Sequence, residues 1–438
     1  MAAQRIPAVQ AAVQIMKDEG VDIAFGCPGA ALRPLYAAMA EAGGIERLSV
    51  RHEETAAFMA DGWARTTGRT GVVAVTAGPG AARLITGLYA ARQDAVPLVC
   101  LTGRETAGPS RRSGPPHQEV HRPPDLVRLA GPVTKRAERI EDPARIPGAF
   151  REAFRIAREG RPGPVLIDVP ADLATVEIAY DAGRRPGFDI QPPQAGMPHA
   201  GTAQAGSAPA GSVRPPVPSD RAGHTGPDAL PASRVLAEVT AVFGAPGPPD
   251  AASDTYLVSS SASAAATALA DAPRRHRLHG RGRPPGWEVP AAIGVRKALD
   301  SRGERTAEVV VVIDGHGLPL LADELASAVR YEVPFVLILC SPGHEDHGGY
   351  EGHGADDEHV TDHVKLVEAY GCAGRDVVEP AELRSAVEWA RKEAVSTRRP
   401  VLVEVRAERA VAERARPLAG RLSGGAATDP VHEFAHRA

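Results

Sequence analysis

The sequence predicts an α/β protein built from two doubly wound parallel-sheet domains. Continuous apolar runs such as residues 71–76 and 308–313 have the composition of strands that are covered by helices on both faces. Glycine-containing turns follow these runs, and segments with helical spacing follow the turns, which is typical of such sheets. A region rich in Pro, Gly, Ala and Ser separates the two sets of elements. The predicted domains are residues 1–180 and 251–412, with a flexible linker at 181–250 and a flexible tail at 413–438.

The composition is that of a soluble protein without nucleic-acid or membrane partners. The chain has 438 residues, 43% hydrophobic and 24% charged, which is enough for two or three domains. A formal net charge of -4 gives no reason to expect a nucleic-acid partner. No apolar run is long enough to cross a membrane, and residues 1–16 lack the pattern of a signal peptide. The four cysteines form no Cys-x-x-Cys pair, so we expect a cytoplasmic protein in a reducing compartment.

The first domain is expected to place three turns at one edge of its sheet. Its predicted helices are residues 5–20, 32–40, 51–65 and 81–92, and its predicted strands are residues 21–26, 48–50, 71–76, 97–103 and 164–170. Ligands of doubly wound sheets bind beyond the carboxyl ends of the strands. The turns at 26–30, 77–80 and 103–108 are therefore predicted to form the walls of a site. Residues 104–123 form a long loop of the kind that is usually functional or disordered.

The second domain repeats the alternation of strands and helices. Its predicted strands are residues 256–258, 308–313, 334–339 and 400–405, and its predicted helices are residues 262–270, 290–299, 320–329, 364–370 and 380–392. A glycine-rich loop at 280–287 precedes the second of these helices. The pattern again predicts a parallel sheet with helices on both faces.

Two carboxylates stand at the start of the helix that follows residue 50. Glu53 and Glu54 fall where the partial positive charge of a helix N-terminus favours acidic side chains, so they could serve the helix alone. The alternative is that Glu53 points from the end of the preceding strand into the site at the sheet edge. Small and apolar residues with helical spacing follow and predict one buried face; they are Ala56, Ala57, Met59, Ala60, Trp63 and Ala64.

Several short runs in this sequence recur in one enzyme family. In the first domain they are residues 24–31, 42–45, 51–53, 77–80, 96–103 and 160–170, and in the second they are residues 286–295 and 362–365. With these runs the chain resembles the thiamine diphosphate-dependent acetolactate synthase family, and most closely its glyoxylate carboligase (tartronate-semialdehyde synthase) branch. The resemblance covers residues 1–180 and 255–410.

The resemblance implies a fold of three domains, of which this chain lacks the middle one. The outer domains of the family bind the aminopyrimidine and the diphosphate of thiamine diphosphate, and residues 181–250 stand where the middle domain would be. Relatives that bind FAD use the middle domain for much of that site, so no FAD is expected. The cofactor site of the family is shared between subunits, which implies at least a homodimer, or a hetero-oligomer with a complete relative.

The resemblance assigns the catalytic glutamate of the family to Glu53. In the family this carboxyl hydrogen-bonds a ring nitrogen of the aminopyrimidine and favours the imino tautomer, which deprotonates the thiazolium carbon. The glyoxylate carboligase branch typically has Val here with a Glu beside it, whereas this chain has both Glu53 and Glu54. The residues expected to bind the cofactor are Pro28, Gly29, Glu53, Gly78, Pro79, Gly80, Gln118, Gly315, His316 and Gly317. Gln118 either reaches the site, as its counterpart does in relatives, or is a solvated loop residue.

The diphosphate domain departs from the family at its metal site. The family binds Mg²⁺ through the Asp of a Gly-Asp-Gly motif and an Asn at the end of the next strand, because this hard ion prefers oxygen ligands. Here those positions are Gly315-His316-Gly317 and Ser341-Pro342. A divalent metal is still expected from the family, with His316 as the candidate ligand, although imidazole suits Zn, Ni or Cu better than Mg²⁺. The His-rich segment 344–363 either joins His316 in a transition-metal site or is a solvated charged loop without metal.

Three functional hypotheses follow. The first is a thiamine diphosphate-dependent C–C lyase or transferase, a carboligase or decarboxylase that acts on a small 2-oxo acid of the glyoxylate or pyruvate class. The second is a degenerate, non-catalytic paralogue or partner subunit, whose Glu53 completes the cofactor site of another chain. The third is an unrelated metal-binding protein that uses the His-rich segment. The two altered motifs, Gly315-His316-Gly317 and Ser341-Pro342, distinguish the first two hypotheses, because an active enzyme must still bind diphosphate there.

Overall fold

The computed structural model describes two domains and part of the chain between them. The described residues are 4–104, 125–180, 230, 232–243, 254–260, 275–280, 283–314, 317–341 and 361–406. Several predicted features lie outside these residues and stay predictions. They are the helix at 262–270, the tail at 413–438, most of the loop at 104–123, the His-rich segment up to residue 360, and the site residues Gln118, Gly315 and His316.

The first domain contains the doubly wound parallel sheet that the sequence predicts. Its six strands are β2 (Ile23–Cys27), β3 (Glu46–Ser49), β4 (Gly71–Thr76), β5 (Leu98–Arg104), β6 (Arg136–Arg139) and β7 (Pro164–Pro170). Their order is β3-β2-β4-β5-β7-β6, and every neighbouring pair is parallel. The carboxyl ends of all six strands therefore meet at one edge.

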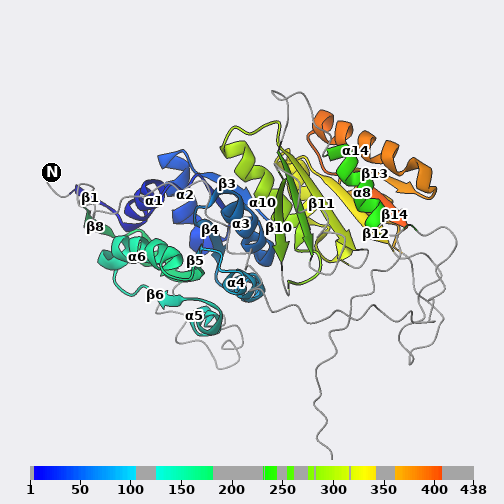
Figure 1. The fold of residues 1–438 in the computed structure, drawn as a ribbon. Helices are drawn as coiled ribbons and strands as arrows, with labels where there is room; N and C mark the ends of the chain where they lie inside the picture. Colours follow the sequence, from blue (N-terminus) through cyan, green and yellow to red (C-terminus); the bar gives the residue numbers. More distant parts are fainter. Residues whose placement is uncertain are drawn as a thin grey trace, which may run out of the picture.

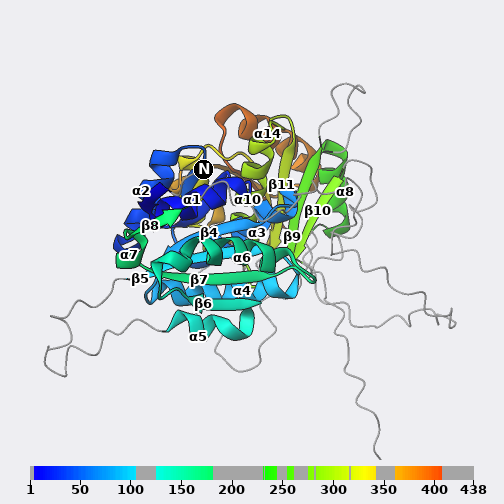
Figure 2. The same ribbon diagram turned by 90° about the vertical axis from the view of Figure 1, so that its left-hand side faces the viewer.

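Helices cover both faces of this sheet (Figure 2). The longer ones are α1 (Ala8–Asp18), α2 (Arg33–Ala42), α3 (Glu53–Thr67), α4 (Leu84–Gln93), α5 (Leu126–Ala130) and α6 (Ile146–Arg158). The short elements are η1 (Ala30–Leu32), η2 (Gly80–Arg83), η5 (Gly131–Val133), η6 (Pro143–Arg145) and α7 (Ala171–Ala174). Apolar residues of α1, α2 and α6 pack on one face, against Val72 and Val99. Apolar residues of α3, α4 and α5 pack on the other face, against Phe25 and Val73.

The prediction of a helix over residues 5–20 is wrong at its start. Residues Gln4–Pro7 form strand β1, which pairs antiparallel with β8 (Glu177–Tyr180), and the helix begins at Ala8. Pro7 explains the boundary, because the residue before a proline is driven towards extended backbone and Ile6 therefore cannot easily be helical. The helix then ends at Asp18, and Gly20 adopts a left-handed conformation with φ 78° just beyond it.

The second domain has its own sheet of six parallel strands. They are β9 (Thr255–Ser260), β10 (Arg275–Gly280), β11 (Glu308–Asp314), β12 (Val336–Ser341), β13 (Ala373–Val377) and β14 (Val401–Arg406), in the order β10-β9-β11-β12-β14-β13. Alternate residues of the central strand β11 enter different cores: Val309 and Val311 face the first domain, whereas Val310 and Val312 face away. This is the two-sided burial that the apolar run predicts.

Helices again cover both faces. On the side of the first domain are α10 (Glu288–Ser301), α11 (Leu318–Leu321), α12 (Glu324–Arg330) and α13 (His363–Ala369), and on the far side are α8 (Ala232–Phe243) and α14 (Leu383–Thr397), which follows η7 (Pro380–Glu382). The single helix predicted at 320–329 is therefore two helices. Leu325 and Ala326 donate their backbone N–H groups three residues back, to Ala322 and Asp323, and this tightened turn separates α11 from α12.

Helix α8 corrects the prediction that residues 181–250 are linker throughout. Its residues Val235, Val239 and Val242 are buried in a core that includes Leu383 and Val387 of α14. These valines have helical spacing, but the Pro- and Gly-rich composition on either side hid the signal. The part of the segment at 230–243 therefore packs as a component of the second domain.

The two domains meet through α3 and α10, which lie side by side between the sheets (Figure 1). A Cβ atom built on Gly294 would lie 1.9 Å from the carbonyl oxygen of Met59, and one built on Gly62 would lie 2.2 Å from that of Ala291. Glycine on both helices thus allows direct contact of the two backbones. One apolar core continues from the first sheet through both helices to the second sheet.

This packing also corrects the prediction that α3 has a single buried face. The helix is buried on almost every side, and even Asp61 and Thr66 are excluded from solvent. The sequence could not show this, because the second apolar partner of the helix is α10, more than 200 residues further along the chain.

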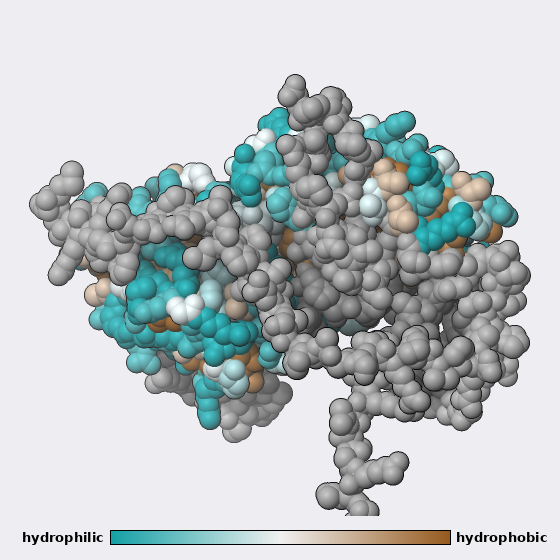
Figure 3. Space-filling model, in the orientation of Figure 1, coloured by the Kyte–Doolittle hydropathy of each residue, from teal (hydrophilic) through white to brown (hydrophobic). Residues whose placement is uncertain are grey.

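On the face shown in Figure 3, hydrophilic residues cover much of both domains and hydrophobic residues form small patches. Among the described residues, no helix combines the length and the apolar character that a membrane span requires.

Candidate active site

The carboxyl edge of the first sheet brings together the turns that the sequence singled out. The turn after β4 is tied to the end of β5, since Ala77 donates its backbone N–H to the carbonyl of Gly103 at 2.7 Å. The turn after β2 packs against the end of β4, where a Cβ on Gly29 would lie 2.3 Å from the Thr76 hydroxyl oxygen. Of the predicted site residues, Pro28, Gly29, Gly78, Pro79, Gly80 and Glu53 all lie along this edge.

Glu53 is the first residue of α3, and its side chain is half-buried against the turn after β4. A Cβ built on Gly80 would lie 1.9 Å from the Oε1 atom of Glu53. The carboxyl group therefore occupies the space that any larger residue at position 80 would need. This placement favours the interpretation in which Glu53 points into the site over one in which it only serves the helix N-terminus.

Glu54 has different surroundings. Burial raises the pKa of this half-buried carboxyl, and the nearby side chains of Arg83 and then His52 partly offset the effect. It therefore faces the end of η2, whereas Glu53 faces Gly80. The two adjacent carboxylates do not share one environment.

A third carboxylate, that of Glu324, also lies close to this edge, near the thiol of Cys27. Burial raises the pKa of Cys27, and the negative charges of Glu53 and then Glu324 raise it further. Glu324 belongs to α12 of the second domain, and its Oε1 atom accepts a hydrogen bond of 2.7 Å from the backbone N–H of Arg51. The start of α3 is thus a contact point between the two domains. No sequence signal identified Glu324, because the contact joins residues 273 positions apart.

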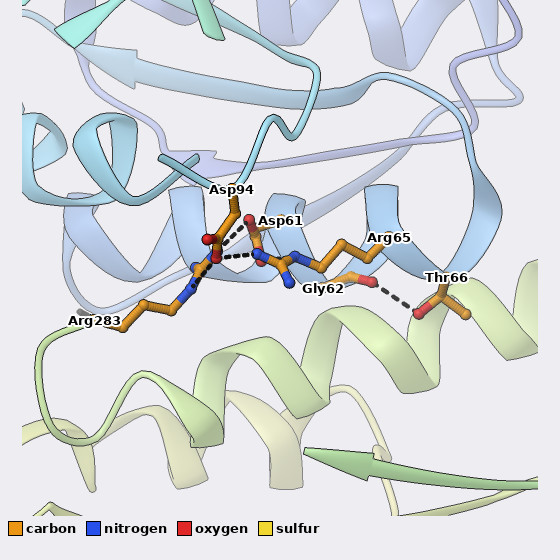
Figure 4. A network of polar contacts seen from close by, with 6 residues as sticks. All are labelled: Asp61, Gly62, Arg65, Thr66, Asp94 and Arg283. Atoms are coloured by element: carbon orange, nitrogen blue, oxygen red, sulfur yellow. Dashed lines mark hydrogen bonds and ion pairs between the residues drawn. The ribbon is translucent and has the colours of Figure 1, made fainter. Parts of the chain in front are cut away.

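A second interdomain contact fixes the glycine-rich loop before α10 (Figure 4). The guanidinium of Arg283 donates to Asp61 at 2.9 Å and to Asp94 at 2.7 Å, and it stacks over the Trp287 ring at 4.7 Å. Arg65 adds a further bond to Asp94. Only 1% of the Arg283 side chain is exposed, so this is a buried ion network. It attaches the loop to the middle of α3.

The loop then passes close to the turn that follows β11. Gly286 has a positive φ of 90°, and a Cβ on it would lie 2.6 Å from the carbonyl oxygen of Gly317. Gly317, a predicted cofactor-binding residue, therefore packs directly against Gly286. Both glycines are buried at this contact, and neither position could hold a side chain without moving the other backbone.

The predicted metal position lies mostly outside the described residues, which include neither His316 nor residues 342–360. Within the described parts of the chain, no cluster of three or more His, Cys, Asp or Glu residues could hold a metal ion. The hydroxyl of Ser341, at the end of β12, donates to Glu404 at 2.6 Å, and His363 lies 2.8 Å from the same carboxyl oxygen. Ser341 is therefore engaged within the protein, and His316 lies outside the described residues.

Comparison with known proteins gives matches in both domains. Residues 7–125 match the family described as thiamine pyrophosphate enzyme, N-terminal TPP binding domain. Residues 259–405 match the corresponding C-terminal TPP binding domain. The two matches leave residues 126–258 uncovered.

Among curated proteins, the chain is 41% identical to glyoxylate carboligase of Escherichia coli O157:H7 over 178 residues, which is 40% of this chain and 29% of the relative. It is 39% identical to the acetolactate synthase large subunit of Haemophilus influenzae over 177 residues, 40% of this chain and 30% of the relative. It is 43% identical to that of Lactococcus lactis over 169 residues, 39% of this chain and 28% of the relative. The matched segment thus spans less than a third of each of these relatives.

Among solved structures, the chain is similar to a crystal structure described as that of a candidate thiamin diphosphate-dependent enzyme from Mycobacterium smegmatis. The TM-score is 0.67 at 16% identity, and the match covers 92% of this chain and 100% of the other. At this identity the similarity concerns the fold alone.

Proposed function

Because the chain belongs to the thiamine pyrophosphate enzymes and carries both of their TPP-binding domains, we propose that it is a carboligase or decarboxylase of a small 2-oxo acid. Glyoxylate and pyruvate are the substrate candidates, since the similar curated proteins are named glyoxylate carboligase and acetolactate synthase. The observation that carries the proposal is the position of Glu53 at the carboxyl edge of the sheet, with its carboxyl against Gly80.

The residues of the first domain fit the aminopyrimidine half of thiamine diphosphate. When bound, this cofactor supplies an acidic thiazolium carbon and an electron sink for the loss of CO₂. Glu53 would donate and accept a proton at a ring nitrogen, which is work for a carboxyl group in a partly dehydrated position. Gly29 and Gly80 leave the room that the side chains of Thr76 and Glu53 occupy at this edge. In the second domain, Gly317 is proposed for the diphosphate end because of the resemblance to the family.

We propose no step that passes through a metal ion. The family leads us to expect Mg²⁺, but the described residues at this edge offer no group of oxygen ligands, and Ser341 already donates to Glu404. A chain without the middle domain is also proposed to work without FAD. We propose a homodimer or larger assembly, because the family shares its cofactor site between subunits.

The test is a titration of the purified chain with thiamine diphosphate by calorimetry, first with Mg²⁺ and then with Zn²⁺ or Ni²⁺. Release of CO₂ from glyoxylate and from pyruvate is measured in parallel. Glu53→Gln should lower turnover by about 100-fold or more, the usual range for loss of an acid–base group. Glu54→Gln is the matched control and should stay within about threefold of the wild type, since Glu54 faces Arg83 instead of the site.

Two results would contradict the proposal. Full activity of Glu53→Gln would remove the assigned role of Glu53. Absence of cofactor binding with every metal would exclude a self-sufficient enzyme, and a chain that restored activity to a complete relative would then be a partner subunit.

A further inference from the structure

The helix that carries Glu53 does not cap its own N-terminus. His52 occupies the N-cap position with extended backbone, and its side chain makes no capping hydrogen bond. Helix N-termini leave several backbone N–H groups without a partner inside the helix. An acceptor oxygen for one of them usually comes from the side chain of a Ser, Thr, Asp or Asn at the N-cap position. The chain entering α3 needs an acceptor from elsewhere.

Glu324 of the second domain is that acceptor. Its Oε1 atom accepts from the backbone N–H groups of Arg51 at 2.7 Å and of His52 at 3.2 Å, and from the hydroxyl of Thr55 at 2.5 Å. The side chain is fully buried. Burial raises the pKa of Glu324, and the hydrogen bonds from Thr55 and from the two backbone groups act against that rise. A buried carboxyl with three donors on one oxygen holds the turn before Glu53 in a defined place.

The side chain of His52 adds a second link across the same junction. Its Nδ1 atom lies 2.7 Å from the guanidinium of Arg83, and its Nε2 atom lies 2.8 Å from a carboxyl oxygen of Asp323. A guanidinium can only donate, so Nδ1 accepts the bond from Arg83. Nε2 then carries the hydrogen and donates it to Asp323. His52 thus bridges η2 of the first domain and the residue directly before α12 of the second.

Both links converge on the residues directly before Glu53. Glu53 has little freedom to adjust, because its carboxyl fills the space above Gly80. A displacement of the turn at 51–52 would therefore move the carboxyl relative to a bound ring. Small displacements of a reacting group have large effects on rate, of about 100-fold for 1 Å.

We propose that Asp323 and Glu324 are positioning residues, through which the second domain sets the direction of the Glu53 carboxyl. This inference rests on the proposed function, in which Glu53 moves a proton at the cofactor ring. Neither residue needs to touch the cofactor. Their effect on the reaction passes through Arg51 and His52 to Glu53.

The experiment compares Glu324→Ala, Glu324→Gln and Asp323→Ala in the full-length protein. Turnover is expressed per bound thiamine diphosphate, with the affinity for the cofactor measured separately. Glu324→Ala should lower turnover by about 10- to 100-fold, the usual effect of losing a residue that orients a reacting group, with cofactor affinity changed by less than about threefold. Glu324→Gln should restore most of the turnover, since its amide oxygen can accept the same backbone bonds. Asp323→Ala removes a less buried side chain and breaks the link through His52. It tests the positioning role if Glu324→Ala does not fold.

A double-mutant cycle with Glu53→Gln distinguishes an effect on the position of Glu53 from a general weakening of the contact between the two domains. If Glu324 acts through Glu53, Glu324→Ala should cause no further loss of turnover in the Glu53→Gln background. Glu388→Ala, an exposed substitution on α14 of the same domain, is the control and should leave turnover unchanged.

The outcomes distinguish this inference from the proposed function. An active wild type whose Glu324→Ala and Asp323→Ala variants keep full turnover would overturn the positioning role alone. Losses that multiply in the double mutant would also overturn it, because they would place Glu324 on an independent path. A wild type that binds cofactor but releases no CO₂ would overturn the proposed function and the positioning role together.

Discussion

The close contact between α3 and α10 predicts the effect of adding one methyl group. In Gly294→Ala the new Cβ would lie 1.9 Å from the Met59 carbonyl oxygen, 2.8 Å from its carbonyl carbon and 3.0 Å from the backbone nitrogen of Trp63. All three atoms belong to the backbone of α3, so no side-chain rotation can relieve the clash. Ordinary contact begins at 3.4 Å, so the helices must move apart by about 1.5 Å.

The expected cost follows from two opposing effects. Overpacking of a filled core costs about 1–3 kcal/mol, and occasionally more. Alanine in place of glycine in a helix stabilises by up to about 1 kcal/mol. One core joins both domains, so the contacts weakened when α3 and α10 move apart lie in both of them. We therefore expect a net loss of about 2 kcal/mol in the free energy of unfolding.

Gly148→Ala is the matched control. Gly148 is an exposed residue of α6, and a Cβ built on it meets nothing within 4 Å. Without a clash only the helix preference remains, so this variant should gain about 0.5–1 kcal/mol. The same chemical change should therefore have opposite signs at the two positions.

The assay is urea unfolding followed by tryptophan fluorescence. Trp63 and Trp287 are buried within the core that joins the domains, so they report on its opening. Each variant is compared through its midpoint and slope, so that a change in cooperativity is not mistaken for a change in stability. A Gly294→Ala variant that is as stable as Gly148→Ala would show that the two backbones are not in contact.

Two further predictions concern the site and the buried ion network. In Gly80→Ala the new Cβ would lie 1.9 Å from the Glu53 carboxyl, so CO₂ release should fall by about 100-fold while the protein stays folded. In Arg283→Met the buried Asp61 and the part-buried Asp94 lose one of the two cations that they share, and Arg65 remains, so the unfolding free energy at neutral pH should fall by about 1–3 kcal/mol. Burial alone would raise the pKa of Asp94, but the charges of Arg283 and its neighbour Arg65 outweigh it and lower the pKa below the usual 3.8. Because the pKa of Asp94 is lower in the folded state, the stabilisation that its charge provides is fully present above pH 3.8. It is lost as the pH falls through the lower, folded-state pKa. The difference in unfolding free energy between the variant and the wild type should therefore shrink over that pH range.

Controls accompany both variants. Gly148→Ala should keep full CO₂ release, so equal losses in it and in Gly80→Ala would refute the steric argument. Arg33→Met, which replaces an exposed arginine of α2, should change stability by less than about 0.5 kcal/mol. A destabilisation by Arg283→Met that stays constant down to about pH 3 would show that the carboxylates do not depend on this cation.

The interior strands of both sheets could be predicted from the sequence, but several edge strands could not. Strands β4 and β11 lie inside their sheets, so their residues are apolar on both faces and form continuous runs. Strands β6, β10 and β13 lie at sheet edges and are rich in arginine and other polar residues. Such composition protects exposed edges, and it also removes the pattern on which a prediction depends.

The sequence predicts those parts of the candidate site that directly follow a strand in the chain. The turns after β2 and β4 and the start of α3 follow strand ends directly, so parallel topology alone places Glu53 beside Gly80. The contacts of Glu324 and Arg283 with α3 join residues more than 200 positions apart, and no periodicity encodes them. Proximity of that kind follows only from the packing of α3 between the two sheets.

The continuous core has a consequence for the evolution of the chain. The two domains hold each other through α3 and α10, so the covalent connection from Tyr180 to Leu230 need not keep them together. Doubling the length of such a connection costs only about 0.6 kcal/mol of loop entropy. The middle of the gene is therefore a permissive insertion point, at which a whole domain can be gained or lost while the outer two stay joined.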